Sequence, residues 1–97
     1  MARKVIWTKR AQQERKDILD FWINHNKSNA FSKKLNQLFK ESIQLIRLYP
    51  RIGRLTDIDN VRVKVVRNYL IFYELVDENI YVLSVWDSKQ DPEELKF

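Results

Sequence analysis

The feature that most constrains this 97-residue chain is its last third, where three runs rich in Val, Ile, Leu, Tyr and Phe follow one another. The runs cover residues 61–66, 69–76 and 80–87. Residues 67–68 and the polar residues 77–79 separate them, and Asn68 marks the first turn. Aromatic and β-branched residues suit the pleated, half-buried surface of a sheet, and connections this short are typical of hairpins. The pattern therefore predicts three consecutive strands joined by hairpins.

The first of these strands separates two kinds of side chain. Val61, Val63 and Val65 alternate with Arg62 and Lys64. Because successive side chains of a strand point to opposite faces, one face of this strand is apolar and the other is cationic. We expect the preceding part of the chain to cover the apolar face, and the cationic face to carry the function.

The preceding part of the chain predicts one strand and two helices. Residues 5–7 form a short apolar run, and Thr8 can accept a hydrogen bond from the first turn of a helix. Apolar stripes then predict helices from residue 9 to about 24 and from about residue 29 to 48. The short polar connection between them implies an antiparallel helical hairpin that can cover a sheet.

A loop and a terminal turn complete the order. Pro50 disfavours helical geometry at the residue before it, and Gly53 allows a positive φ, so the second helix should end here. The polar residues 56–60 lead into the first of the three strands, and Asp91 followed by Pro92 predicts a single helical turn near the C-terminus. The result is one α+β domain over residues 1–97 with the order β-α-α-β-β-β.

The composition excludes several classes of protein. The chain has no cysteine, so a disulfide framework and a thiolate metal site are both impossible. It also lacks an apolar run near the roughly 18–20 residues of a membrane span, and its N-terminus has no secretory apolar region. We expect a soluble cytoplasmic protein without a metal ion or other cofactor.

The positive charge is concentrated in one part of the chain. The formal net charge is +5, and residues 47–67 hold six cations against two anions, whereas the rest of the chain is nearly balanced. Five of these six cations are arginines, whose guanidinium groups suit bidentate phosphate contacts. This concentration suggests a polyanionic target such as nucleic acid, the alternative being a solvated face that keeps the protein soluble.

Four segments, in this order, resemble the RelE/ParE superfamily of toxins from bacterial type II toxin–antitoxin pairs: residues 49–54, 61–63, 69–74 and 82–89. The resemblance covers essentially the whole chain. It implies a helical hairpin packed on a twisted, mainly antiparallel sheet, and a cognate antitoxin that wraps the toxin and blocks its active surface. RelE-like members cut mRNA in the ribosomal A site, whereas ParE-like members inhibit DNA gyrase.

The resemblance also implies candidate site residues. Metal-independent RNA cleavage needs a base for the ribose 2′-hydroxyl, cations for the phosphate and an acid for the leaving 5′-oxygen. Arg62, Arg67 and Lys89 match basic positions of the family, and Lys64 lies on the same face of its strand as Arg62. Further contacts to nucleic acid are expected from two arginines and from three rings that can stack on bases, namely Arg51, Arg54, Tyr69, Tyr73 and Trp86.

Asp87 departs from the pattern, because many RNase members carry His near the end of the last strand. An Asp with its usual pKa near 3.9 can act as a base but is a poor acid at neutral pH. Lys64 or Lys89, with a pKa lowered by neighbouring arginines, is the other possible acid. The long helical hairpin and residues 50–54 also look ParE-like. We favour a ribosome-dependent mRNA endonuclease, with a gyrase inhibitor or an inactive binding module as alternatives.

Purely structural roles compete with these assignments. Arg62 can pair with Glu74 on the neighbouring strand. The rings of Tyr73 and Trp86 can pack in the core instead of stacking on bases. Asp87 can cap the terminal segment.

Overall fold

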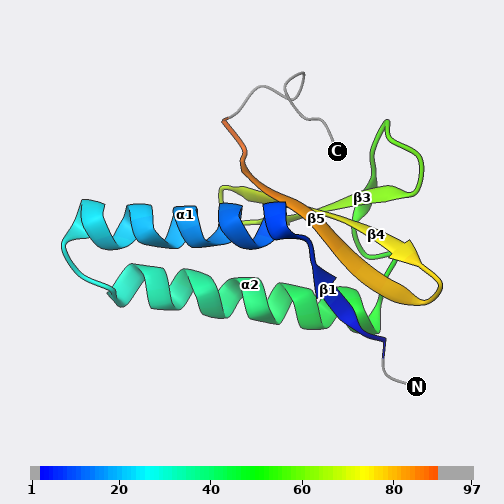
Figure 1. Cartoon of the computed structure of the whole chain (residues 1–97), viewed down its shortest axis with the longest axis horizontal. Coiled ribbons are helices and arrows are strands. Elements are labelled where there is room, and N and C mark those ends of the chain that lie inside the picture. Colours follow the sequence, from blue (N-terminus) through cyan, green and yellow to red (C-terminus); the bar gives the residue numbers. More distant parts are fainter. Residues whose placement is uncertain (1–2, 90–97) are drawn as a thin grey trace.

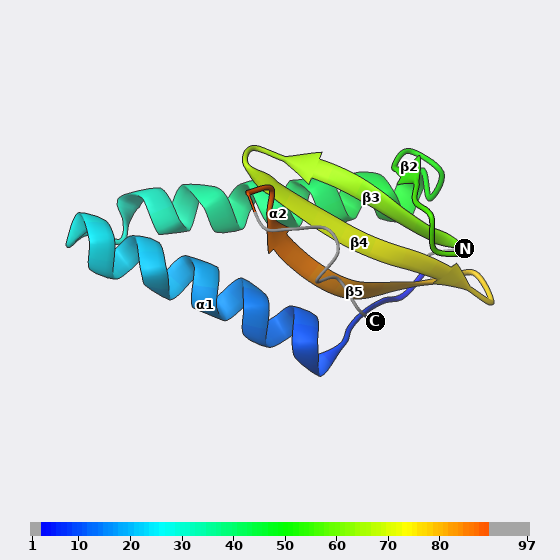
Figure 2. The same ribbon diagram turned by 90° about the horizontal axis from the view of Figure 1, so that it is seen from above.

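The structure is a computed structural model that describes residues 3–89. Two helices lie together on one face of a sheet (Figure 1), and the strands of that sheet run obliquely across them when seen from above (Figure 2). The elements, in chain order, are β1 (Val5–Trp7), α1 (Lys9–Asn26), α2 (Ala30–Leu48), β2 (Arg54–Leu55), β3 (Val61–Val66), β4 (Tyr69–Val76) and β5 (Asn79–Asp87).

The described strands form one sheet with the order β1-β5-β4-β3-β2. β1 is parallel to β5, and the other neighbouring pairs are antiparallel. This arrangement confirms the predicted α+β class with a helical hairpin on a mainly antiparallel sheet. The two-residue strand β2 is an addition to the predicted order, and the turn predicted at residues 91–95 lies outside the described residues.

Thr8 joins the start of α1 to the sheet, as its sequence position predicts for a helix cap. Its hydroxyl oxygen accepts a hydrogen bond from the Ala11 amide at 3.1 Å. The same hydroxyl lies 3.0 Å from the Val82 carbonyl oxygen, to which it donates, and the Thr8 amide donates to that carbonyl as well. The hydroxyl therefore satisfies a free amide of the first helical turn and fixes α1 against β5.

The main core lies between the helices and the sheet. A hydrogen bond also joins α1 to β4 across this core: the indole Nε1 of Trp22 donates to the Tyr69 hydroxyl at 2.7 Å. Within the hairpin, the Ser32 hydroxyl donates to the Leu19 carbonyl at 3.0 Å. The largest side chains that are fully buried in this core are Leu35, Phe39, Ile46, Ile71, Tyr73, Ile80 and Val82.

The two faces of β3 are the reverse of the expected arrangement. Arg62 pairs with Tyr73 and Lys64 pairs with Ile71, and both partners belong to the helix-side core. Residues directly opposite each other in an antiparallel pair share a face, so the cations lie on the helix side. The prediction that the helices cover the valine face of β3 is therefore wrong.

The physical reason is that other strands supply the helix-side core. Within β3 only Val66, at its end, joins that core, whose centre is filled from β4 and β5. The valine side of β3 instead faces a second apolar cluster on the opposite face, which we call the open sheet face. This cluster contains Val61, Phe72 and Trp86, with Val63, Leu70 and Leu83 packed against them.

Candidate functional site

The loop after α2 is held in place by one buried phenol. The Tyr73 hydroxyl donates a hydrogen bond to the Pro50 carbonyl at 2.7 Å and accepts one from the Gly53 amide at 2.9 Å. Burial raises the pKa of Tyr73, although the Gly53 amide and the Arg62 charge act in the opposite direction. The phenol therefore stays protonated at neutral pH and can make both hydrogen bonds at once.

Arg62 holds the same loop from the neighbouring strand. Its Nη1 donates to the Gly53 carbonyl at 2.8 Å and lies 3.3 Å from the Arg51 carbonyl. We call Tyr73 and Arg62, together with the residues 50–53 that they hold, the loop clamp. The guanidinium group from which the sequence predicts a phosphate contact is thus bound to main-chain oxygens of its own chain.

The predicted pairing of Arg62 with Glu74 is wrong. Val61 is the residue opposite Glu74, so Glu74 shares the face of Val61. Arg62 is adjacent to Val61 in the strand and points to the other face. A cross-strand ion pair would need a register one residue away from the observed one.

Gly53 is required for a reason other than the predicted one, because its φ is not positive. A Cβ atom at this position would lie 2.7 Å from the Tyr73 hydroxyl oxygen and 2.9 Å from the Val63 carbonyl oxygen. Both distances are well inside van der Waals contact. The glycine therefore allows the loop to approach the ring of Tyr73.

The predicted phosphate-binding cations do not gather at one place. Arg51 is exposed within the loop clamp and Arg54 directly after it, whereas Arg67 is exposed in the turn after β3. Arg67 lies five residues beyond Arg62, which corresponds to about 16 Å along a strand. Lys64 lies between the two groups and is partly exposed.

The second group of cations lies at the β3–β4 turn, which we call the turn end. The Ser88 amide donates to the Asn68 carbonyl at 2.8 Å and so joins the segment after β5 to this turn. Lys89 is exposed here, and its amide donates to the Asp87 carboxylate at 2.9 Å. The structure therefore brings Arg67, Asp87 and Lys89 to one end of the sheet and leaves Arg51, Arg54 and Arg62 at the other.

The three rings predicted to stack on bases are buried: Tyr69 is 7% exposed, Tyr73 is 0% and Trp86 is 5%. Tyr69 packs edge-on against Phe39, and Trp86 packs edge-on against Phe72. Little of any of these rings is open to a base. The alternative that Tyr73 and Trp86 serve as core residues is confirmed.

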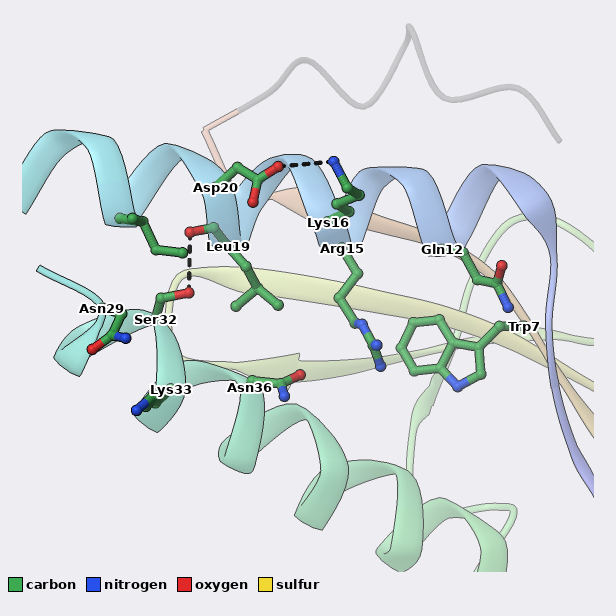
Figure 3. A pocket seen from close by; sticks show the side chains of 11 residues that line it. Trp7, Gln12, Arg15, Lys16, Leu19, Asp20, Asn29, Ser32, Lys33 and Asn36 are labelled. Carbon is green, nitrogen blue, oxygen red and sulfur yellow. Dashed lines mark hydrogen bonds and ion pairs between the residues drawn. The ribbon is translucent and has the colours of Figure 1, made fainter.

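Two clefts were not predicted from the sequence. The first lies between α1 and α2, has a volume of about 540 Å³ and is shown in Figure 3. In it the Arg15 guanidinium lies 4.8 Å from the centre of the Trp7 ring, and the Lys16 ammonium lies 3.1 Å from the Asp20 carboxylate. That hydrogen bond raises the pKa of Lys16. These contacts stabilise α1 and its junction with β1.

The second cleft, which we call the α2-end cleft, lies where α2 gives way to the clamped loop and measures about 530 Å³. Its walls come from three separate stretches of the chain, so no local pattern in the sequence marks it. The residues that line it are Arg3, Leu48, Tyr49, Pro50, Arg51, Ile52 and Leu75.

Residues 3–89 contain no cluster of three or more His, Cys, Asp or Glu side chains placed to hold a metal ion. Across the same residues, neither helix is long and apolar enough to cross a membrane.

Solved structures identify the fold as that of the RelE/ParE toxins. The chromosomal ParDE system of P. aeruginosa matches with a TM-score of 0.78 and 16% identity, over 89% of this chain and 96% of that one. Free E. coli toxin RelE, as a doubly substituted mutant, matches with a TM-score of 0.65 and 20% identity, over 92% and 86%. The same mutant in complex with an antitoxin RelBc peptide matches with a TM-score of 0.58 and 23% identity, over 93% of this chain and 87% of that one.

The family follows from the sequence itself. Residues 5–92 match the family model described as ParE toxin of type II toxin-antitoxin system, parDE. The chain therefore belongs to the ParE toxin family. No curated protein matches it in sequence.

Proposed function

We propose that this chain is a toxin that inhibits DNA gyrase through a protein–protein contact and does not cleave mRNA. The observation that carries the proposal is the loop clamp, in which Arg62 donates to the Gly53 and Arg51 carbonyls. A catalyst of phosphate chemistry must direct several charged groups at one phosphate. Here the guanidinium group of Arg62 is bound to main-chain carbonyls of the clamped loop, and Arg67 lies in the turn beyond the end of β3, five residues further along the chain.

Membership of the ParE toxin family supports this choice of target, because ParE-like members of the superfamily inhibit gyrase. It also implies a cognate antitoxin as the neutralising partner. We infer that both encounters take place in the bacterial cytoplasm, where gyrase acts on the chromosome. We further propose that the antitoxin covers the open sheet face, where the partly exposed side chains of Val63, Leu70 and Leu83 offer an apolar surface.

A supercoiling reaction without ribosomes tests the proposal. Purified gyrase, relaxed plasmid and ATP are incubated with increasing amounts of the toxin, and the topoisomers are separated on a gel. We expect supercoiling to stop at toxin concentrations near that of gyrase and to return when the antitoxin is added. Full supercoiling in a large excess of folded toxin would refute the proposal.

One observation favours an mRNA endonuclease as the second candidate. The turn end carries two exposed cations, Arg67 and Lys89, beside the partly exposed carboxylate of Asp87. In such a site Asp87 would be the base and the cations would contact the phosphate. Mapping of mRNA 5′ ends in a purified translation reaction tests this candidate. It predicts cuts at A-site codons that depend on ribosomes and disappear in Arg67→Ala.

A further inference from the structure

The α2-end cleft exists because α2 stops before the sheet does. Leu75 lies on the helix side of β4, opposite the buried Ile80, yet it is 38% exposed because α2 ends at Leu48. Leu48 itself is 63% exposed, and Tyr49 and Ile52 are exposed as well. Large apolar side chains that are exposed together around a cleft are typical of an interaction site.

The charge of the cleft defines its partner further. Among the residues that line it, the charged ones are Arg3 and Arg51, and both are cations. Nη1 of Arg3 donates to the Arg47 carbonyl at 3.1 Å, which fixes this guanidinium group in the wall of the cleft. A guanidinium group makes its strongest hydrogen bonds with a carboxylate, so two arginines in one cleft favour an acidic partner.

The loop clamp makes the cleft rigid before any partner arrives. Tyr73 holds Pro50 and Gly53, and Arg62 holds the carbonyl of Arg51, so the main chain beneath the lining side chains is fixed at several points. A partner that enters this cleft does not have to order the loop, which lowers the entropic cost of binding.

We propose that the α2-end cleft binds an acidic segment of the cognate antitoxin. A large apolar side chain of that segment enters between Leu48, Ile52 and Leu75, and a neighbouring carboxylate reaches Arg3 and Arg51. Charge complementarity supports an acidic partner, because the toxin carries a net charge of +5 and the cleft itself is cationic. The contact lies on the helix side and is separate from the open sheet face. It rests on the antitoxin partner and not on the choice between gyrase and mRNA.

The experiment measures the affinity of purified antitoxin, produced from the gene that adjoins the toxin gene, for toxin variants by calorimetry. Leu48→Asp and Arg51→Glu change exposed side chains in the cleft, and we expect each to raise Kd about tenfold or more. The matched controls are Phe21→Asp, at an α1 residue that is 56% exposed, and Lys34→Glu, at an exposed cation of α2 outside the cleft. We expect both controls to bind as the wild type does, and thermal unfolding verifies that all four are folded.

Three outcomes would overturn the proposal. If folded Leu48→Asp and Arg51→Glu bind the antitoxin as tightly as the wild type, the cleft is not an antitoxin site. If these variants keep their affinity for the antitoxin but no longer inhibit gyrase, the cleft is a contact site for gyrase and not for the antitoxin. If the wild type sediments as a dimer and Leu48→Asp sediments as a monomer with unchanged antitoxin affinity, the occupant is a second copy of the chain. The binding readout contains no gyrase, so failure of the proposed function leaves this test intact.

Discussion

The two ends of β3 carry the same kind of side chain in different roles. Arg62, in the first half of the strand, donates hydrogen bonds to the carbonyls of a clamped loop and is partly buried. Arg67, just after the strand, is exposed in a turn with a φ of 56°. The comparison shows that a cation in a basic segment can belong to the fold or to the surface, and only its hydrogen-bond partners distinguish the two roles.

The same comparison explains why the two ends should respond differently to mutation. At the clamp end each polar group has a partner that would be left unsatisfied, because residues 50–53 rely on Tyr73 and Arg62. At the turn end Arg67 extends from an exposed hairpin turn. Loss of a clamp residue should therefore change stability, whereas loss of a turn-end cation should leave it nearly unchanged.

The largest effect is expected for Tyr73→Phe. Removal of the hydroxyl leaves the Gly53 amide and the Pro50 carbonyl without their partner, which should lower the free energy of unfolding by roughly 2–4 kcal/mol. Urea denaturation measures this difference. Tyr81→Phe, at a partly exposed ring of β5, is the control and should cost less than about 0.5 kcal/mol. Equal stability of Tyr73→Phe and the wild type would show that the clamp does not hold the loop.

Gly53→Ala should destabilise the protein by about 1–3 kcal/mol, because the added methyl group forces the loop away from the ring. The same urea titration measures the loss. The double variant Gly53→Ala/Tyr73→Phe should lose less free energy of unfolding than the sum of the losses of the two single variants. The reason is that the Tyr73 hydroxyl oxygen, one of the atoms that the added methyl group clashes with, is then absent. If the losses in free energy of unfolding add up in this double-mutant cycle, the destabilisation by Gly53→Ala does not arise from a clash with the Tyr73 hydroxyl.

Arg62→Ala and Arg67→Ala compare the two ends directly. We expect Arg62→Ala to lower the free energy of unfolding by about 1–2 kcal/mol through the lost hydrogen bonds to the loop. Arg67→Ala should change it by less than about 0.5 kcal/mol. Thermal or urea unfolding of the two variants side by side gives the result, and the reverse order would contradict the structural assignment of Arg62.

The smallest effect is confined to high pH. Burial raises the pKa of Tyr73 above 10.0 in the folded protein, so above pH 10 the unfolded chain loses this proton first and the folded state binds more protons. Its contribution to stability is therefore present below pH 10 and decreases as the pH rises through the folded pKa. Unfolding measured between pH 8 and pH 11 should show a steeper decline for the wild type than for Tyr73→Phe. The same dependence of unfolding free energy on pH in the wild type and in Tyr73→Phe would contradict a raised pKa of Tyr73 in the folded protein.

Much of the fold could be predicted because its signals are local. The hairpins follow from short polar breaks between apolar runs, and the start of α1 follows from Thr8, whose hydroxyl meets the Ala11 amide only three residues away. Which face of β3 the helices cover could not be predicted. That choice depends on the pairing of Arg62 with Tyr73, and the alternation of valines and cations looks the same for either face.

The roles of the candidate site residues were harder to predict, because they depend on contacts between distant residues. Gly53 is constrained by a ring twenty residues away, although glycine in a loop usually suggests a positive φ. Arg62 carries a charge that suits phosphate, but its guanidinium group is directed at carbonyl oxygens. The sequence gives the residue types, but the role of each residue depends on the atoms that the fold places next to it.

Mapping of mRNA 5′ ends tests the functional account most directly, if it is done with a toxin preparation whose inhibition of gyrase has been titrated first. The account predicts that, at toxin concentrations that stop supercoiling, a purified translation reaction shows no new 5′ ends in the presence of ribosomes. New ends at A-site codons, combined with gyrase that keeps its full supercoiling activity, would contradict it and move the active surface to the turn end.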